Sequence, residues 1–200
     1  MIDNYQALTL GRFLKIDAVL EGEGEDIDKQ VRIIAILDDK TVDEVLLLPL
    51  ADYADLAGKT AFLREPCKPT EIHEGWRAGD LVPVLDYTKI NTAQYVDFQT
   101  FAPQFPQSLP QLLSVLLVPE GKAYNDGYDV ADVQRRVADL PIADALGLSA
   151  FFFGRFLELT QASLGYLEDA MKRAKGKERK KMEAALAVAR SLTSGDGSLT

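Results

Sequence analysis

The stretch Ile27–Leu37, which reads IDKQVRIIAIL, indicates the fold class of this chain. Its apolar residues recur every three or four positions, which is the period of an α-helix that buries one face: Ile27, Val31, Ile34 and Leu37. A second stretch of helical period, Thr9–Leu20, precedes it, and the acidic turn EGEGED separates the two. The sequence therefore predicts that the chain begins with a pair of amphipathic helices.

Further helices are predicted after this pair. TVDE (Thr41–Glu44) fits a capping box, in which the first and last residues satisfy each other's free backbone N–H groups. The following leucines stop at Pro49, which cannot continue a helix without a kink. Another helix is expected to run to Leu63. The N-terminal third is therefore expected to hold three or four short helices.

Residues 66–90 have a different character. They contain EIHEGW, RAGD and LVPVLDYTKI, in which strand-forming residues flank turns at Gly75 and Gly79. This pattern predicts a small β-hairpin. Pro83 lacks a backbone N–H, so its strand is expected at an edge of the sheet.

Helices are predicted again after the hairpin. Asn91 or Thr92 is placed to cap the helix TAQYVDFQTF, which ends at Phe101. Ser108 and Gln111 are spaced as a second capping box. DVADVQRRVADL, which starts at residue 129, begins with an aspartate of the type that caps helices.

The most apolar run is LGLSAFFFGRFLEL (Leu146–Leu159). It is too short and too charged to span a membrane, so a buried helix is expected. The segment around it predicts either one long helix or two helices joined at Gly147. Gly147 and Gly154, seven residues apart with Ala150 between them, form a stripe of small residues that would let another helix approach closely.

Composition places the chain among ordinary globular proteins, with 200 residues, 47% of them hydrophobic and 26% charged. We expect a mainly α fold: a single helical domain over residues 1–171 with the inserted β-hairpin, then a basic helical extension and frayed tail over residues 172–200. The single cysteine and the absence of a signal-peptide pattern in MIDNYQALTL favour a cytoplasmic protein.

Charge argues against nucleic acid as a partner. The net charge is −9, and residues 172–200 hold eight Lys or Arg against three Asp or Glu, so the rest of the chain is strongly acidic. An acidic body repels phosphate. The basic run Lys172–Lys181 has no aromatic residues to stack on bases and is interpreted as a solvated helix surface.

No cluster of residues predicts a catalytic, cofactor or metal site. Cys67 and His73 are too few for a structural zinc site, and in a hairpin they would lie too far apart for a nucleophilic pair. The carboxylates of residues 21–28 do not have the spacing of an EF-hand loop and are interpreted as a solvated turn. GKT at residues 58–60 lacks the earlier glycine of a phosphate loop.

Four aromatic residues are candidates for contact with a protein partner: Tyr95, Phe98, Tyr124 and Tyr128. The first two fall on one face of the helix over residues 92–101, where Gln94 is placed to complete a cap with Asn91. The other two flank Asn-Asp-Gly in YNDGYD, a tight turn with Gly127 at positive φ. Packing against neighbouring helices is the first interpretation of all four, and partner binding is the second.

The order of these segments resembles a known group of proteins. Helices containing DKQVRIIAIL and LPLADYADLAGKTAFL precede LDYTKI, NTAQYVDFQTF, LLSVLLVPEGKAYNDGYDVADV and a long aromatic-rich helix. Over residues 8–170 the chain resembles tail assembly chaperones and similar tail-morphogenesis proteins of tailed phages and prophages, chiefly those of Bacteroidetes hosts. The best-marked parts are QYVDFQ (Gln94–Gln99) and VPEGKAYNDGYD (Val118–Asp129).

The resemblance implies a non-enzymatic factor in the cytoplasm of the bacterial host that binds a phage tail protein, above all the tape-measure protein, during virion assembly. It implies that apolar helical surfaces cover the long amphipathic helices of this client. Self-association as a homo-oligomer along the client would multiply weak contacts. Two alternatives stay open: a tail-completion or connector protein retained in the virion, and an enzyme or host-directed regulator.

Overall fold

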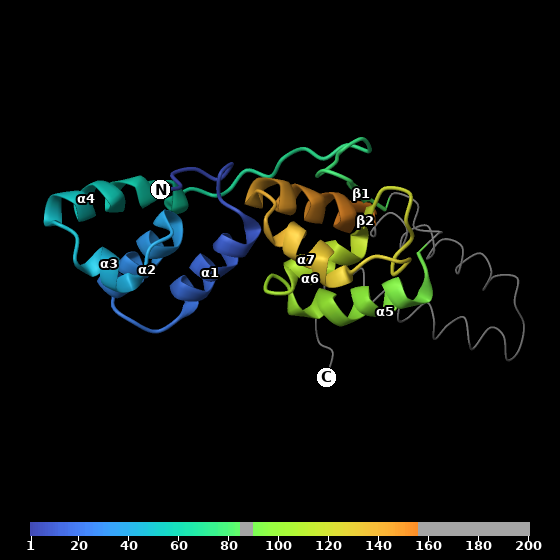
Figure 1. The fold of residues 1–200 in the computed structure, drawn as a ribbon, viewed down its shortest axis with the longest axis horizontal. Coiled ribbons are helices and arrows are strands. Elements are labelled where there is room, and N and C mark those ends of the chain that lie inside the picture. Colours follow the sequence, from blue (N-terminus) through green and yellow to red (C-terminus); the bar gives the residue numbers. More distant parts are fainter. Residues whose placement is uncertain (85–89, 156–200) are drawn as a thin grey trace, which may run out of the picture. The chain divides into compact units, whose positions relative to one another are not determined.

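The computed structural model describes residues 1–84 and 90–155 (Figure 1). The chain is mainly helical with one small two-stranded antiparallel sheet, as the sequence predicted. It divides into two compact units, Met1–Ser149 and Ala150–Thr200, and the account below concerns the first unless stated otherwise. The predicted boundary after residue 171 and the basic extension over residues 172–200 lie outside the described residues.

The elements follow one another along the chain with short connections. They are α1 (Leu10–Glu21), α2 (Asp26–Asp38), α3 (Val42–Leu46), α4 (Leu50–Lys59), the 3-10 turn η1 (Thr60–Arg64), β1 (Leu81–Pro83), α5 (Thr92–Phe101), the 3-10 turn η3 (Ala102–Gln104), α6 (Leu109–Leu116), β2 (Leu117–Pro119), α7 (Val130–Ala138) and a last helix whose described part covers 142–155.

The first two helices form the predicted pair. Thr9 caps α1, because its side-chain oxygen accepts a hydrogen bond from the Arg12 backbone N–H. Three of the four apolar stripe residues of α2 are buried: Val31, Ile34 and Leu37. Ile27 differs, since 57% of its surface is exposed. It lies in the first turn of α2, beside the acidic connection between the two helices.

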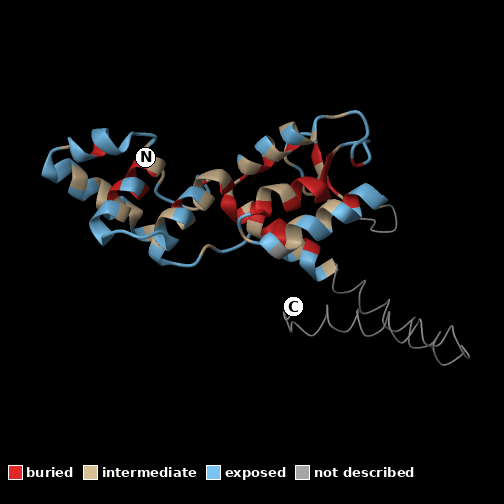
Figure 2. Cartoon of the chain, turned by 90° about the horizontal axis from the view of Figure 1, so that it is seen from below, coloured by how far each residue is buried: buried red, intermediate tan, exposed pale blue. Residues whose placement is uncertain are grey.

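The capping box at the start of α3 is confirmed. The Thr41 hydroxyl oxygen accepts a hydrogen bond from the Glu44 backbone N–H, and a Glu44 carboxylate oxygen lies 2.7 Å from the Thr41 backbone nitrogen. The turn directs Val45 into a cluster with Val31 and Ile34 of α2. Buried residues are dense in α6, whereas α4 contains none (Figure 2).

The strand predicted near Pro83 exists, but its partner differs from the prediction. In the described residues β1 pairs antiparallel with β2, with Val82 opposite Val118, and not with a second strand of the 66–90 segment. Between Pro66 and β1 the chain is mostly irregular, with a tight turn joining Ala78 to Leu81. A strand of three residues is stabilised by the apolar surface it covers, and β2 offers buried Leu117 and Val118.

Two predicted details of helix capping are wrong. Asn91 caps α5 by accepting from the Gln94 N–H, but the Gln94 side chain donates to the Val115 carbonyl oxygen at 2.6 Å instead of completing that cap. Ser108 and Gln111 form no capping box. Ser108 has ψ near 9°, whereas a capping residue is extended, and its hydroxyl donates to the Phe101 carbonyl.

The last helix begins beside α1. The Leu10 N–H donates to the Leu140 carbonyl and the Ile142 N–H donates to the Leu8 carbonyl, both at 2.8 Å. Asp129 caps α7, as predicted, by accepting from the Ala131 N–H. The helix that starts at residue 142 continues through Gly147 to residue 155 without a break, so the described part is one helix.

Candidate functional site

The two motifs that carry the resemblance lie against each other. The Tyr124 hydroxyl donates to an Asp97 carboxylate oxygen at 2.7 Å, and the Asn91 side chain donates to the Tyr124 carbonyl at 3.1 Å. Tyr124 is 6% exposed. Burial, and then the neighbouring Asp97 carboxylate, raise the pKa of Tyr124 well above its usual value. These residues join helix α5 to the loop before α7.

The predicted partner-binding aromatics therefore have different positions. Tyr124 belongs to a buried cluster with Val115 and Val118, and Phe98 and Tyr128 pack against that cluster. Tyr95 is 55% exposed. Of the four aromatics, only Tyr95 offers most of its side chain to a partner.

The YNDGYD segment is a turn, as predicted. Gly127 has φ +69° and Asn125 has φ +63°, both in the left-handed region. The Tyr128 side chain packs inward, and burial raises the pKa of its hydroxyl. The main contribution of this segment in the folded chain is to anchor Tyr124 against α5.

A different surface exposes the largest apolar side chains. Leu46 and Leu47 at the end of α3 are 62% and 84% exposed, and Leu50 at the start of α4 is 82% exposed. We call these three residues the leucine patch. The polypeptide turns at Pro49, so Val45 and Leu48 reach the core while their leucine neighbours point outward. Large apolar side chains grouped in this way mark interaction surfaces.

The leucine patch continues an apolar row that is already partly covered. On α4, Tyr53 and Leu56 pack against the cluster formed by α2 and α3. Leu50 precedes Tyr53 by three residues, so it extends the same face of the helix beyond the cover that α2 provides. An apolar helix laid on Leu50 would therefore lengthen an existing core.

A second surface feature is a groove of about 480 Å³ along α1, α2 and the start of α3. Arg12, Lys15 and Val19 line it from α1 at helical spacing. We call it the α1–α2 groove. The other lining residues come from α2 and the segment after it: Arg32, Ala35, Ile36, Asp39, Lys40, Thr41 and Val42.

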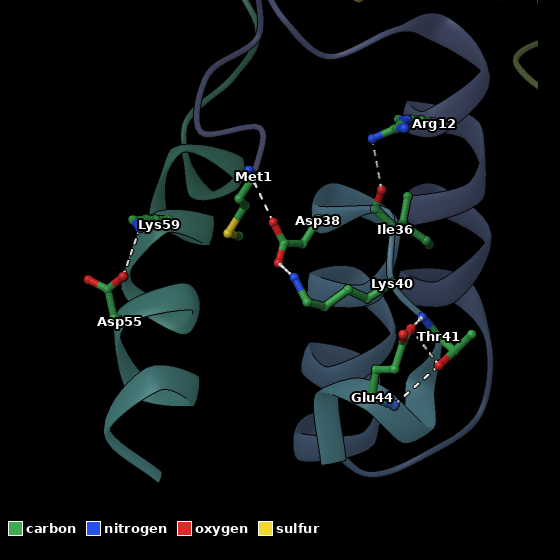
Figure 3. Close-up of polar contacts among 9 residues, drawn as sticks. All are labelled: Met1, Arg12, Ile36, Asp38, Lys40, Thr41, Glu44, Asp55 and Lys59. Carbon is green, nitrogen blue, oxygen red and sulfur yellow. Dashed lines mark hydrogen bonds and ion pairs between the residues drawn. The ribbon is translucent and has the colours of Figure 1, made fainter. Parts of the chain in front are cut away.

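The cations of the α1–α2 groove are held to different degrees. The Arg12 guanidinium donates to the Ile36 carbonyl at 3.2 Å (Figure 3) and lies 3.2 Å from an Asp39 carboxylate oxygen. Lys40 pairs with Asp38, and this bond holds the pKa of Asp38 below its usual value. In the described part of the chain, neither Lys15 nor Arg32 forms an ion pair.

The remaining candidates from the sequence have structural surroundings. Burial raises the pKa of the Cys67 thiol, which disfavours the thiolate that a nucleophilic pair needs. The His73 Nδ1 atom accepts a hydrogen bond from the Gly75 N–H. Among residues 1–84 and 90–155, no three His, Cys, Asp or Glu side chains are grouped so that they could hold a metal ion.

Comparisons with known proteins add no relative. The chain matches no protein-family model, no curated protein and no solved structure. No helix in the part of the chain that the structure describes is long and apolar enough to cross a membrane.

Proposed function

We propose that this protein is a non-enzymatic assembly factor of tailed phages that binds a tail component, the tape-measure protein, in the cytoplasm of the bacterial host. The observation that carries the proposal is the exposed leucine patch, Leu46, Leu47 and Leu50. The resemblance of QYVDFQ and VPEGKAYNDGYD to tail assembly chaperones supplies the identity of the client.

The proposed mechanism is physical. A long amphipathic helix has an apolar stripe that promotes aggregation until the stripe is buried. The leucine patch offers a complementary apolar surface, and the row Leu50–Tyr53–Leu56 runs in one direction along α4, as a helical client requires. Burying three leucine side chains is worth about 1.5 to 3 kcal/mol each before the costs of association. Such contacts hold a client reversibly.

Co-expression with the tape-measure protein of the same phage or prophage tests the proposal. The wild-type chain is expected to keep the client soluble and to co-purify with it. The variant Leu47→Glu/Leu50→Glu is expected to lose both effects while its circular dichroism spectrum is retained, because both side chains are exposed. A wild-type chain that neither solubilises nor retains the client contradicts the proposal.

The matched control is Val96→Glu on α5. Val96 is 52% exposed, so this variant also places a charge on an exposed apolar position, next to Tyr95. It is expected to bind the client like the wild type. Capture that survives the leucine changes but fails in Val96→Glu would place the binding site at α5 instead. Mass spectrometry of purified particles separates an assembly factor, which is absent or scarce, from a retained tail component.

A further inference from the structure

The connection between α1 and α2 has the opposite character to the α1–α2 groove. We call residues 20–27 the acidic tip. It carries the carboxylates of Glu21, Glu23, Glu25 and Asp26, and all of these residues are exposed. Two apolar side chains flank them: Leu20 is 51% exposed and Ile27 is 57% exposed. The tip therefore presents carboxylates and apolar groups together.

The α1–α2 groove presents the complementary groups. Lys15 and Arg32 are exposed and form no ion pair in the described residues, and Arg12 and Lys40 add positive charge beside them. Val19, Ile36 and Val42 provide apolar lining. A surface that combines cations with apolar side chains binds a segment that combines carboxylates with apolar side chains.

We propose that the acidic tip of one copy of this chain binds in the α1–α2 groove of a second copy. The tip cannot enter its own groove, because Glu21 and Lys15 are fixed on the same helix, α1. The groove volume of about 480 Å³ suits a few side chains of a turn and not a folded domain. The contact does not use the leucine patch, so it stands apart from client binding.

Other occupants fit the groove less well. A nucleic acid would meet the repulsion of a chain with net charge −9, and it has no aliphatic side chains to set against Val19 and Ile36. The run Lys172–Lys181 is basic and would be repelled by the groove. The acidic tip provides both the charge and the apolar groups that the groove lacks.

Sedimentation velocity of the full chain over a range of protein and salt concentrations tests the proposal. The wild type is expected to self-associate at low ionic strength and to dissociate as salt screens the contact. Two charge-reversed variants are compared: Lys15→Glu/Arg32→Glu in the groove and Glu23→Lys/Glu25→Lys in the tip. Each alone is expected to self-associate at least about tenfold more weakly, because like charges then face each other. An equimolar mixture of the two is expected to recover association, since reversed tips meet reversed grooves.

The control variant is Lys68→Glu/Lys122→Glu. It changes the net charge by the same amount as the groove variant, but both lysines are exposed outside the groove. It is expected to associate like the wild type. A monomeric wild type, unchanged association in the groove variant, or a mixture that stays dissociated would each overturn the proposal. Binding of a short DNA duplex by a monomeric wild type would identify a polyanion as the occupant and overturn it as well.

Discussion

The carbonyl oxygen of Thr70 occupies the space where a side chain on Gly147 would begin. The Thr70 N–H donates to the Ala143 carbonyl at 2.9 Å, and its hydroxyl donates to Asp144 at 2.6 Å. The irregular segment before β1 is therefore seated on the first turns of the helix that starts at residue 142. The small-residue stripe predicted to admit another helix admits an extended segment at Gly147.

Gly147→Ala is predicted to destabilise the fold. The added methyl group would overlap the Thr70 carbonyl, and the Ile72 Cγ1 atom lies only 3.0 Å from the same position. Overpacking of this kind costs about 1 to 3 kcal/mol. Urea unfolding followed by the fluorescence of Trp76, the single tryptophan, measures the loss.

Gly154→Ala is the matched control for that prediction. It lies in the same helix, and no atom is found within 4 Å of its added Cβ. Alanine favours a helix over glycine by about 1 kcal/mol, so the midpoint should be unchanged or higher. Equal destabilisation by both variants would show that helix geometry, and not the approach of Thr70, explains the effect.

Local patterns made the helices predictable. The apolar period of α2 and the Thr41–Glu44 capping box depend on residues within one or two turns of each other, and both are present. The partner of β1 was not predictable in the same way. Residues 81–83 pair with 117–119, and nothing in a three-residue strand specifies such a distant partner.

The candidate surfaces show the same division. Aromatic residues attracted the first interpretation, but Tyr124 is buried because a distant residue, Asp97, accepts its hydroxyl. The run of leucines around Pro49 was the available signal for the leucine patch, since consecutive leucines cannot all face one core. The spacing of Arg12 and Lys15 on α1 hints at a charged face. Only the antiparallel partner α2 makes that face one wall of a groove.

Gln94→Ala is predicted to destabilise the junction of α5 and α6. The Gln94 side chain is 3% exposed and donates to the Val115 carbonyl, which lies in the last turn of α6. Removing the donor leaves that buried carbonyl without this hydrogen bond, at a cost of about 1 to 3 kcal/mol. Gln99→Ala on the exposed face of α5 should change stability by less than about 0.5 kcal/mol. Similar losses in the two variants by thermal unfolding would contradict the role given to Gln94.

Tyr124 is predicted to link stability to alkaline pH. Its pKa is raised in the folded chain, so the folded state holds this proton more tightly than the unfolded state, whose tyrosine pKa is about 10. The stabilisation is complete below about pH 10 and is lost as pH rises above it. Tyr124→Phe should unfold with a smaller decline in stability over this range. Absorbance of tyrosinate should show one tyrosine fewer ionising only on unfolding, and an identical pH profile would refute the assignment.

The two sites predicted as capping boxes should behave differently in double-mutant cycles. Thr41 and Glu44 exchange hydrogen bonds, and the Thr41 backbone N–H and hydroxyl hold the pKa of Glu44 below its usual value. Thr41→Ala should cost about 1 kcal/mol, and its effect should be smaller when Glu44 is already alanine. That coupling should disappear when the carboxylate is protonated in acid.

Ser108→Ala and Gln111→Ala provide the comparison. Ser108 donates to the Phe101 carbonyl, and the buried Gln111 Oε1 atom has no hydrogen-bond partner, so the two side chains share no bond. Each substitution should have its own effect on stability, and the two effects should add within about 0.5 kcal/mol. Coupling at residues 108 and 111 as strong as that at 41 and 44 would mean that the second capping box forms in solution after all.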